Sequence, residues 1–428
     1  MKNPVALEKL AERDKNHIWH PLTQHKTAQL PLGIVKAEGA LVWDEDGKSY
    51  IDGIASWYTA MFGHCNPHIV EAMTQQMQQL DFVMFSGFTH TPAVELSEQL
   101  IKILPDNQAK IFFNDNGSTA IEAAIKMAIQ YHHNKGEKRD TIIAFEDGFH
   151  GDTFGAMSAS GISSYNGPFE DFLLKVVRVP VPTEENVETI LRELDKILAE
   201  NSCSAFVFEP LVQGAAGMKF HSAEGLDEMI AKCQKAGALC IADEIMTGFG
   251  KTGKNFASEN LTHTPDIICL SKALTAGMFP LSITSCSQAV FDAFLSEEVS
   301  KGFFHAHTYS AHPLGCAAAL ASIQLLNSDE ILERRAFITE QHEHFVNKLK
   351  AHPKVKDARS KGVILALDLA LDANRYGSVR DRLYQFFMNE GVNLRPLGNT
   401  IYALPPYVIT DEQLHQIYGS IEKALEIL

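Results

Sequence analysis

A chain of 428 residues is long enough for two domains, and 45% apolar with 21% charged residues is typical of a folded protein. No stretch approaches the roughly 18 consecutive apolar residues that a membrane span requires, so we expect no membrane segment. The net charge of −16 repels phosphate backbones and argues against a nucleic-acid-binding protein.

Two further features bear on where the protein works. Its first residues, Met1 to Pro4, lead into a charged segment that lacks the apolar core of a secretion signal. The seven cysteines are scattered without a CxxC pair, which favours reduced thiols over disulfides or a zinc site. We therefore expect a cytoplasmic protein without a metal site.

The predicted elements begin with a β-hairpin, in which two apolar, β-prone runs flank the turn Glu45-Asp46-Gly47-Lys48. From about residue 95, short apolar runs alternate with helical stretches, which predicts a mainly parallel sheet with helices on its faces. The predicted strands are 110–113, 141–145, 205–208, 238–242, 267–270 and 281–285, and the helices are 118–133, 223–236 and 313–326.

The last hundred or so residues predict a smaller α+β domain. A long polar helix is expected over 330–351, weaker strands near 362–368 and 393–396, and a closing helix from Thr410. The chain is therefore interpreted as an α/β protein in three parts. These are an N-terminal segment that joins the small domain (1–60), a large domain (61–314) and a C-terminal small domain (315–428).

Asp243 and Lys272 are the strongest candidates for catalytic residues. Asp243 comes at the end of one predicted strand and Lys272 directly after the next, and ligands of open α/β sheets bind at that edge. A carboxylate there can keep the ring nitrogen of pyridoxal phosphate (PLP) protonated, and a lysine can form an imine with its aldehyde. Either residue alone could be a cap or a surface charge, but the pair favours a PLP site.

Two loops could complete such a site. Asn116-Gly117-Ser118 stands between a predicted strand and a predicted helix, where free backbone N–H groups can bind a phosphate. An ordinary helix N-cap is the alternative. Phe149 follows another predicted strand and could stack on a flat cofactor ring or simply anchor a loop.

In combination, these motifs resemble the class III (ω-) aminotransferases over essentially the whole chain. The resemblance implies fold type I of the PLP enzymes and a homodimer with active sites at the subunit interface. It rests on Asp243-Glu244-Ile245 with Thr247-Gly248-Phe249-Gly250, Ser271-Lys272, Asn116-Gly117-Ser118, Phe149-His150-Gly151 and Glu209-Pro210.

The resemblance also implies a role for each matching residue. The PLP phosphate would be held by the backbone and side chains of one loop and by a threonine that reaches across from the neighbouring subunit. The ring would lie between two apolar side chains, with a carboxylate at its nitrogen and a lysine at its aldehyde. In this order, the residues are Asn116, Gly117, Ser118, Thr308, Phe149, Ile245, Asp243 and Lys272.

Within the family, the resemblance extends to members that convert 8-amino-7-oxononanoate to 7,8-diaminononanoate in biotin biosynthesis. It implies that Trp57 and Tyr402 line the substrate channel and that Arg395 pairs with the carboxylate of the keto acid. The planar fork of an arginine suits a carboxylate, although a surface salt bridge is the alternative. The supporting stretches are Ile18-Trp19-His20-Pro21, Ser56-Trp57-Tyr58, Arg395 to Tyr402 and Pro405-Pro406-Tyr407.

The resemblance implies S-adenosylmethionine, the usual donor of these members, as the amino donor, and Trp57 and Tyr402 offer aromatic surface to its sulfonium cation. Ala306 would lie in the loop that the donor contacts. Lysine remains an alternative donor, since His305-Ala306-His307-Thr308 lacks the Gly-Pro of the adenosylmethionine-using members. Leu22, Phe149 and Lys251 also depart from the usual Tyr, Tyr and Arg. Another ω-aminotransferase acting on a different amine, and a PLP-binding regulator without turnover, are the remaining alternatives.

Overall fold

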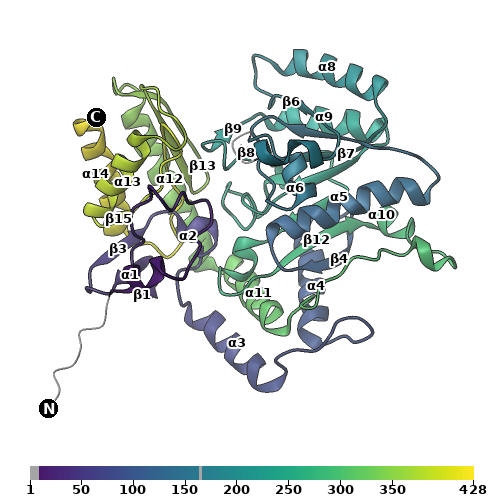
Figure 1. Cartoon of the computed structure of the whole chain (residues 1–428), viewed down its shortest axis with the longest axis horizontal. Coiled ribbons are helices and arrows are strands. Elements are labelled where there is room, and N and C mark those ends of the chain that lie inside the picture. The colour runs from purple at the N-terminus through teal and green to yellow at the C-terminus, as the bar shows by residue number, and fades with distance from the viewer. Residues whose placement is uncertain (1–8, 163–165) are drawn as a thin grey trace.

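Apolar runs form a seven-stranded sheet in the larger lobe of the computed structural model, which describes residues 9–162 and 166–428 (Figure 1). Only β12 is antiparallel to its neighbours, which confirms the predicted mainly parallel sheet. The strand β6 was not predicted. The strand order is β4 (Gln108–Asn114), β12 (Ser282–Ser287), β11 (Ile267–Leu270), β10 (Leu239–Asp243), β7 (Cys203–Phe208), β5 (Thr141–Phe145) and β6 (Val176–Val179).

Both faces of this sheet are buried. Ile142 and Ala144 of β5 belong to the core beneath α5, whereas Ile143 and Phe145 belong to the core on the opposite face. Burial on both faces explains why the strands are apolar throughout instead of alternating with polar residues. The helices around the sheet are α5 (Gly117–Asn134) and α6 (Phe154–Ala159) on one face, α8 (Val187–Glu200) and α9 (Ala223–Lys235) on the other, and the short α10 (Gln288–Asp292).

A long apolar helix, α11 (Pro313–Leu326), packs against α3 (Pro67–Gln79), α4 (Thr91–Ile103) and the 3-10 helix η3 (Lys272–Thr275). The residues of α11 are almost all apolar or small and most of them are buried, as expected of a helix packed on several sides. The boundary expected after residue 314 falls inside α11. We therefore propose that the division between the two lobes lies between α11 and α12 (Asp329–Leu349).

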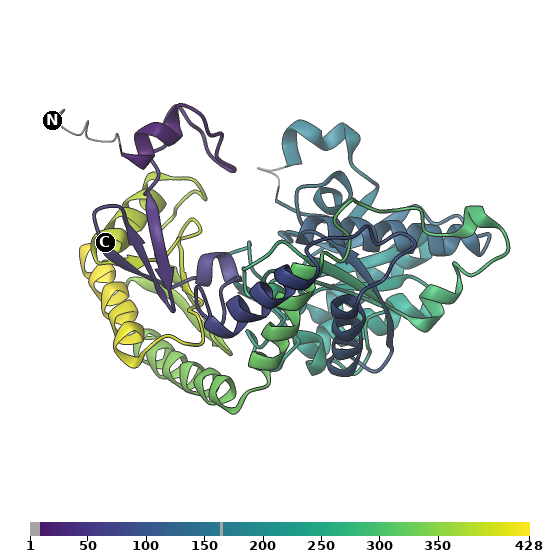
Figure 2. The same ribbon diagram turned by 90° about the horizontal axis from the view of Figure 1, so that it is seen from below.

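The smaller lobe combines both ends of the chain, as the purple and yellow segments of Figure 2 show. The predicted hairpin is confirmed by β2 (Leu41–Asp44) and β3 (Ser49–Asp52), and β3 pairs in parallel with β15 (Val392–Asn393). A second sheet contains β13 (Val355–Lys361), β14 (Ile364–Leu369) and β16 (Thr400–Ala403). The remaining elements are β1 (Ile34–Glu38), α1 (Leu10–Lys15), α2 (Ala55–Tyr58), α13 (Ser378–Asn389) and α14 (Asp411–Ile427), with the short β8 (Val212–Gln213) and β9 (Lys219–Phe220) beside the large sheet.

No helix in the described ranges is long and apolar enough to cross a bilayer, and no group of three or more metal-binding side chains occurs in those ranges. All seven cysteines carry free thiols. Met1 to Pro4, on which the expectation about a secretion signal rests, lie outside the described residues.

Candidate active site

Asp243 and Lys272 lie at the carboxyl ends of two adjacent parallel strands, as predicted. Asp243 is the last residue of β10 and pairs in register with Cys269 of β11, and Lys272 begins η3 two residues after that strand ends. Lys272 has a φ of 49°, in the left-handed region where a residue with a side chain is strained. Such strain concentrates at functional sites, where the surrounding structure holds it in place.

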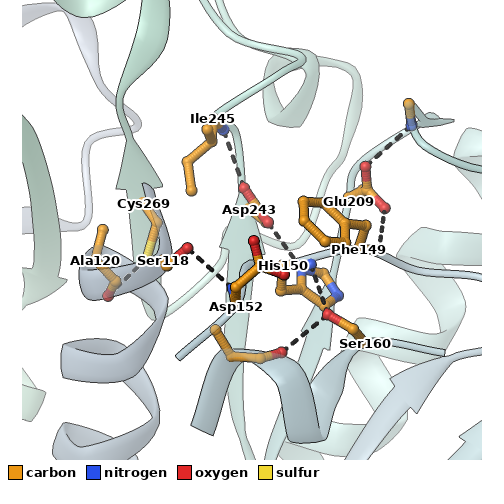
Figure 3. Close-up of polar contacts among 12 residues, drawn as sticks. Ser118, Ala120, Phe149, His150, Asp152, Ser160, Glu209, Asp243, Ile245 and Cys269 are labelled. Carbon is orange, nitrogen blue, oxygen red and sulfur yellow. Dashed lines mark hydrogen bonds and ion pairs between the residues drawn. The ribbon is translucent and has the colours of Figure 1, made fainter. Parts of the chain in front are cut away.

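The carboxylate of Asp243 is buried and held by two donors (Figure 3). His150 donates from Nδ1 to Oδ2 over 2.7 Å, and the backbone N–H of Ile245 donates to Oδ1 over 3.1 Å. Each oxygen keeps a second lone pair for a further donor. Burial alone would lower the pKa of His150, but the hydrogen bond and the charge of Asp243 outweigh it and raise that pKa.

The motif Phe149-His150-Gly151 predicted no role for His150. The signal that could have identified it is its position next to Phe149 and Gly151, directly after a strand that ends at the same edge as β10. A histidine at that edge is within reach of a carboxylate on a nearby strand. Its contact with Asp243 makes it a residue that orients the carboxylate.

The amino group of Lys272 has no hydrogen-bond acceptor among the described residues. Burial lowers the pKa of Lys272, whereas the charges of Asp243 and Glu209 act in the opposite direction. Burial also raises the pKa of Glu209 to about 7, and its two oxygens accept backbone N–H groups of Phe149 and Gly214 at 3.2 and 3.0 Å. A lysine with a lowered pKa is more often neutral, and the neutral amine is the nucleophile.

The N-terminus of α5 forms a cradle for an anion. The side chain of Asn116 caps the helix by accepting the N–H of Thr119 at 3.1 Å, so the N-cap alternative describes what this side chain does. The first N–H groups of the helix, at Gly117 and Ser118, have no acceptor within the described part of the chain. Backbone N–H groups at a helix N-terminus attract phosphate.

Two glycines keep this cradle open. A Cβ on Gly117 would lie 3.1 Å from the Ile245 side chain. A Cβ on Gly151, whose φ is 133°, would lie 2.2 Å from Oγ of Ser118. Ser118 in turn accepts the backbone N–H of Asp152 at 3.1 Å. The cradle, the buried carboxylate and the lysine together fit the phosphate, ring nitrogen and aldehyde of PLP.

Ile245 and Phe149 lie on either side of Asp243 in the view of Figure 3. Ile245 is buried against the start of α5, and Phe149 is half-buried, with its backbone tied to Glu209. This arrangement suits a flat ring whose nitrogen points at Asp243. The sequence motifs therefore converge on one place in the fold.

Tyr58 and Tyr402 adjoin Lys272 on the side of the smaller lobe. The amino group of Lys272 lies 5.2 Å from the centre of the Tyr58 ring, and the Tyr58 hydroxyl donates to that of Tyr402 over 3.1 Å. Burial raises the pKa of Tyr402 to about 12. The aromatic motif Ser56-Trp57-Tyr58 predicted no role for Tyr58, and its contact with Lys272 now places it beside the candidate reacting amine.

Arg395 lies over the ring of Trp57, with 5.3 Å between the guanidinium carbon and the ring centre. A second ring, that of Tyr384, is 5.9 Å away. Arg395 is exposed and forms no salt bridge with any residue that the structure describes. The surface salt bridge is thus not observed, and the guanidinium can receive a carboxylate from a ligand.

Ala306 and Thr308 are exposed and form no hydrogen bond or ion pair with the site residues above, as far as the structure describes them. Their segment runs beside α5, where Lys126 lies 2.9 Å from Nδ1 of His305. Both rings nearby, Phe304 and Tyr309, are also largely exposed. A single chain therefore does not bring this segment to its own Lys272.

Residues 22–425 match the family described as aminotransferase class-III. The chain belongs to the class III aminotransferases, a family of PLP-dependent enzymes. A relative named adenosylmethionine-8-amino-7-oxononanoate aminotransferase, from Synechococcus elongatus, is 43% identical over 96% of this chain and 98% of its own length.

Solved structures agree with this relationship. The crystal structure of an adenosylmethionine-8-amino-7-oxononanoate aminotransferase from Methanocaldococcus jannaschii has a TM-score of 0.93 at 31% identity, and the match covers 98% of each chain. A PLP-bound amine transaminase from an uncultivated Pseudomonas species has a TM-score of 0.90 at 28% identity, covering 96% of this chain and 98% of its own. The predicted α/β fold and family are confirmed.

Proposed function

We propose that this chain uses PLP to convert 8-amino-7-oxononanoate to 7,8-diaminononanoate, a step of biotin biosynthesis, with S-adenosylmethionine as the amino donor. The substrate assignment is carried by Arg395, which lies over Trp57 and forms no salt bridge among the described residues, because the residue after Trp57, Tyr58, contacts Lys272. A carboxylate group and a reacting carbonyl group can thus be held by one continuous surface. The names of relatives at 43% and 31% identity support the same substrate.

The chemistry divides between cofactor and protein. PLP, when bound, supplies an electron sink for the carbon that carries the transferred amine. Asp243 holds a proton on the ring nitrogen, and His150 keeps that carboxylate oriented. The amino group of Lys272, favoured in its neutral form by burial, accepts a proton from the amine-bearing carbon of the donor and later delivers one to the keto carbon of the acceptor.

The remaining proposed residues bind rather than react. Gly117 and Ser118 hold the phosphate through the start of α5, beneath the cap made by Asn116. Ile245 and Phe149 enclose the ring. The planar guanidinium of Arg395 binds the carboxylate of the keto acid, and the aromatic residues Trp57 and Tyr402 line the substrate channel.

The donor can be tested in a single turnover. The PLP-loaded protein is mixed with S-adenosylmethionine or with lysine, and the visible absorbance band of the lysine-linked cofactor is followed. We expect the band to disappear with S-adenosylmethionine, since Trp57 gives its sulfonium an aromatic surface, and to persist with lysine.

Each other outcome has a distinct meaning. Conversion by lysine alone would make the donor assignment wrong and leave the aminotransferase assignment intact. Conversion by other amines, with no turnover of 8-amino-7-oxononanoate, would identify a different ω-aminotransferase. A band that no amine removes would identify a PLP-binding protein without turnover.

We further propose a homodimer in which Thr308 and Ala306 serve the active site of the second copy. An apolar surface is available, made of Met84, Phe88, Phe304 and Tyr309, which are 54–74% exposed. The ring centres of Phe82 and Tyr309 lie 5.4 Å apart. The segment that contains Met84 and Phe88 therefore adjoins the segment that contains Phe304 and Tyr309. Exposed apolar residues gathered in this way mark an interaction surface.

Mixing two inactive variants tests the shared site. Thr308→Glu would repel the phosphate of the other copy, and Lys272→Ala removes the reacting amine. In a hybrid dimer, the Lys272 of one chain meets the intact Thr308 of the other. We expect about a quarter of the wild-type activity, because half of the dimers are hybrid and each has one complete site.

Thr308→Ser is the matched control and should retain activity alone. If Thr308 acted within its own chain, every site in the mixture would be defective and no activity would return. A protein that is monomeric by light scattering and still fully active would also contradict the proposal.

The seven free thiols support a reducing compartment, and we retain the cytoplasm as the proposed location.

A further inference from the structure

The short element α2 is a left-handed turn. Its four residues, Ala55 to Tyr58, have φ values of 46°, 46°, 63° and 69°. None of them is glycine, and left-handed backbone brings each Cβ too close to a carbonyl oxygen. Four such residues in succession persist only where the surrounding structure fixes them.

The buried carboxylate of Asp52 accepts hydrogen bonds from three separate segments of the chain. The hydroxyl of Ser56 donates to Oδ2 over 2.7 Å, and Nε2 of His64 donates to the same oxygen over 2.9 Å. The side-chain amide of Asn393, in β15, donates to Oδ1 over 3.2 Å. We call Asp52, Ser56, His64 and Asn393 the Asp52 clamp.

The clamp joins the two segments that present the proposed substrate residues. Ser56 immediately precedes Trp57, and Asn393 lies two residues before Arg395. Gly53 brings these segments together, because a Cβ there would lie 2.7 Å from the Leu394 side chain. One carboxylate therefore bonds to the residue before Trp57 and to the strand that ends two residues before Arg395.

We propose that the Asp52 clamp is a positioning device for the keto-acid substrate, which holds the left-handed turn so that Trp57 and Arg395 together accept a carboxylate. The inference rests on the proposed function. None of the four clamp residues forms a hydrogen bond or ion pair with Asp243, Lys272 or Ser118 in the described part of the chain. The clamp therefore has no direct bond to these cofactor-site residues, and its nearest link to Lys272 is Tyr58, the last residue of the same turn.

Two substitutions of the exposed Ser56 separate this role from general stability. Ser56→Ala removes the hydrogen bond and keeps the strained Cβ, so the turn can relax. We expect the KM for 8-amino-7-oxononanoate to rise about tenfold, which is the order of one hydrogen bond's net contribution. Bound PLP should stay nearly unchanged, and kcat should fall by less than the KM rises, since only Tyr58 of this turn adjoins Lys272. Ser56→Gly removes the same bond but adopts a φ of 46° without strain, so it should recover most of the loss.

The emission of Trp57 gives a readout independent of the substrate. In PLP-loaded protein with Trp19→Phe and Trp43→Phe, Trp57 is the only tryptophan, and Ser56→Ala should shift the tryptophan emission while Ser56→Gly should not. An unchanged KM and emission in Ser56→Ala would overturn the inference, as would equal losses in both variants. If the wild-type protein does not accept the keto acid, the proposed function fails, and the emission still decides whether the clamp holds the turn.

Discussion

Replacing Lys272 by alanine should abolish turnover while the protein still folds and binds PLP. The variant loses both the amine that links to the cofactor and the base that moves the proton. General bases alone contribute about 10²–10⁴-fold, so we expect a loss of at least about 10⁴ in kcat. The visible absorbance band of the lysine-linked cofactor should disappear, while PLP held through its phosphate at Gly117 and Ser118 remains measurable after denaturation.

Lys254→Ala is the matched control for Lys272→Ala. Lys254 is an exposed lysine close in sequence, whose amino group donates to the backbone oxygen of Glu259 at 2.7 Å. This control should keep both the activity and the absorbance band. Turnover retained by Lys272→Ala would remove that residue from its role.

Asp243→Asn should have the second largest effect. The amide keeps the shape of the carboxylate but loses the charge that holds a proton on the ring nitrogen, so the electron sink weakens. We expect kcat to fall about 10²–10³-fold, with little change in bound PLP, because the lost interaction matters most in the transition state. Steady-state kinetics and PLP content are the measurements.

Asp357→Asn is the matched control for Asp243→Asn, because Asp357 is an exposed carboxylate. Asp357 bonds to Arg359 in the smaller lobe and should tolerate the change. His150→Asn should fall between the two, because it removes the ring that donates to Asp243 but leaves the N–H of Ile245 in place. An unchanged kcat in Asp243→Asn would assign the ring nitrogen to another group.

Much of the large sheet could be predicted because its strands are buried on both faces. Apolar runs such as Ile267–Leu270 are bounded by polar or turn-forming residues, and the helix Pro313–Leu326 begins with proline after a capping histidine. Strand β6 was not predicted because Arg178 interrupts a run of three valines. Strand β13 was not predicted because its exposed residues are mostly charged. Strands with one solvated face carry a weaker pattern than buried ones.

The candidate site was predicted where residues act from strand ends, and less completely elsewhere. Asp243 and Lys272 follow directly from the order of strands along the chain. The left-handed turn at Ala55–Tyr58 was not predictable, since its sequence lacks the glycine or asparagine that signals such a backbone. The roles of Ala306 and Thr308 stay predictions because they depend on a second chain.

The pairing of β3 with β15 sets an order on how the protein is made. Ile51 pairs with Val392, so the first sheet of the smaller lobe stays incomplete until nearly the whole chain has left the ribosome. The strands that carry Asp243 and Lys272 are synthesised earlier and can fold around PLP first. The segments that contain Asn393, Arg395 and Tyr402 are synthesised last, so we expect the proposed cofactor cradle to form before the proposed carboxylate site.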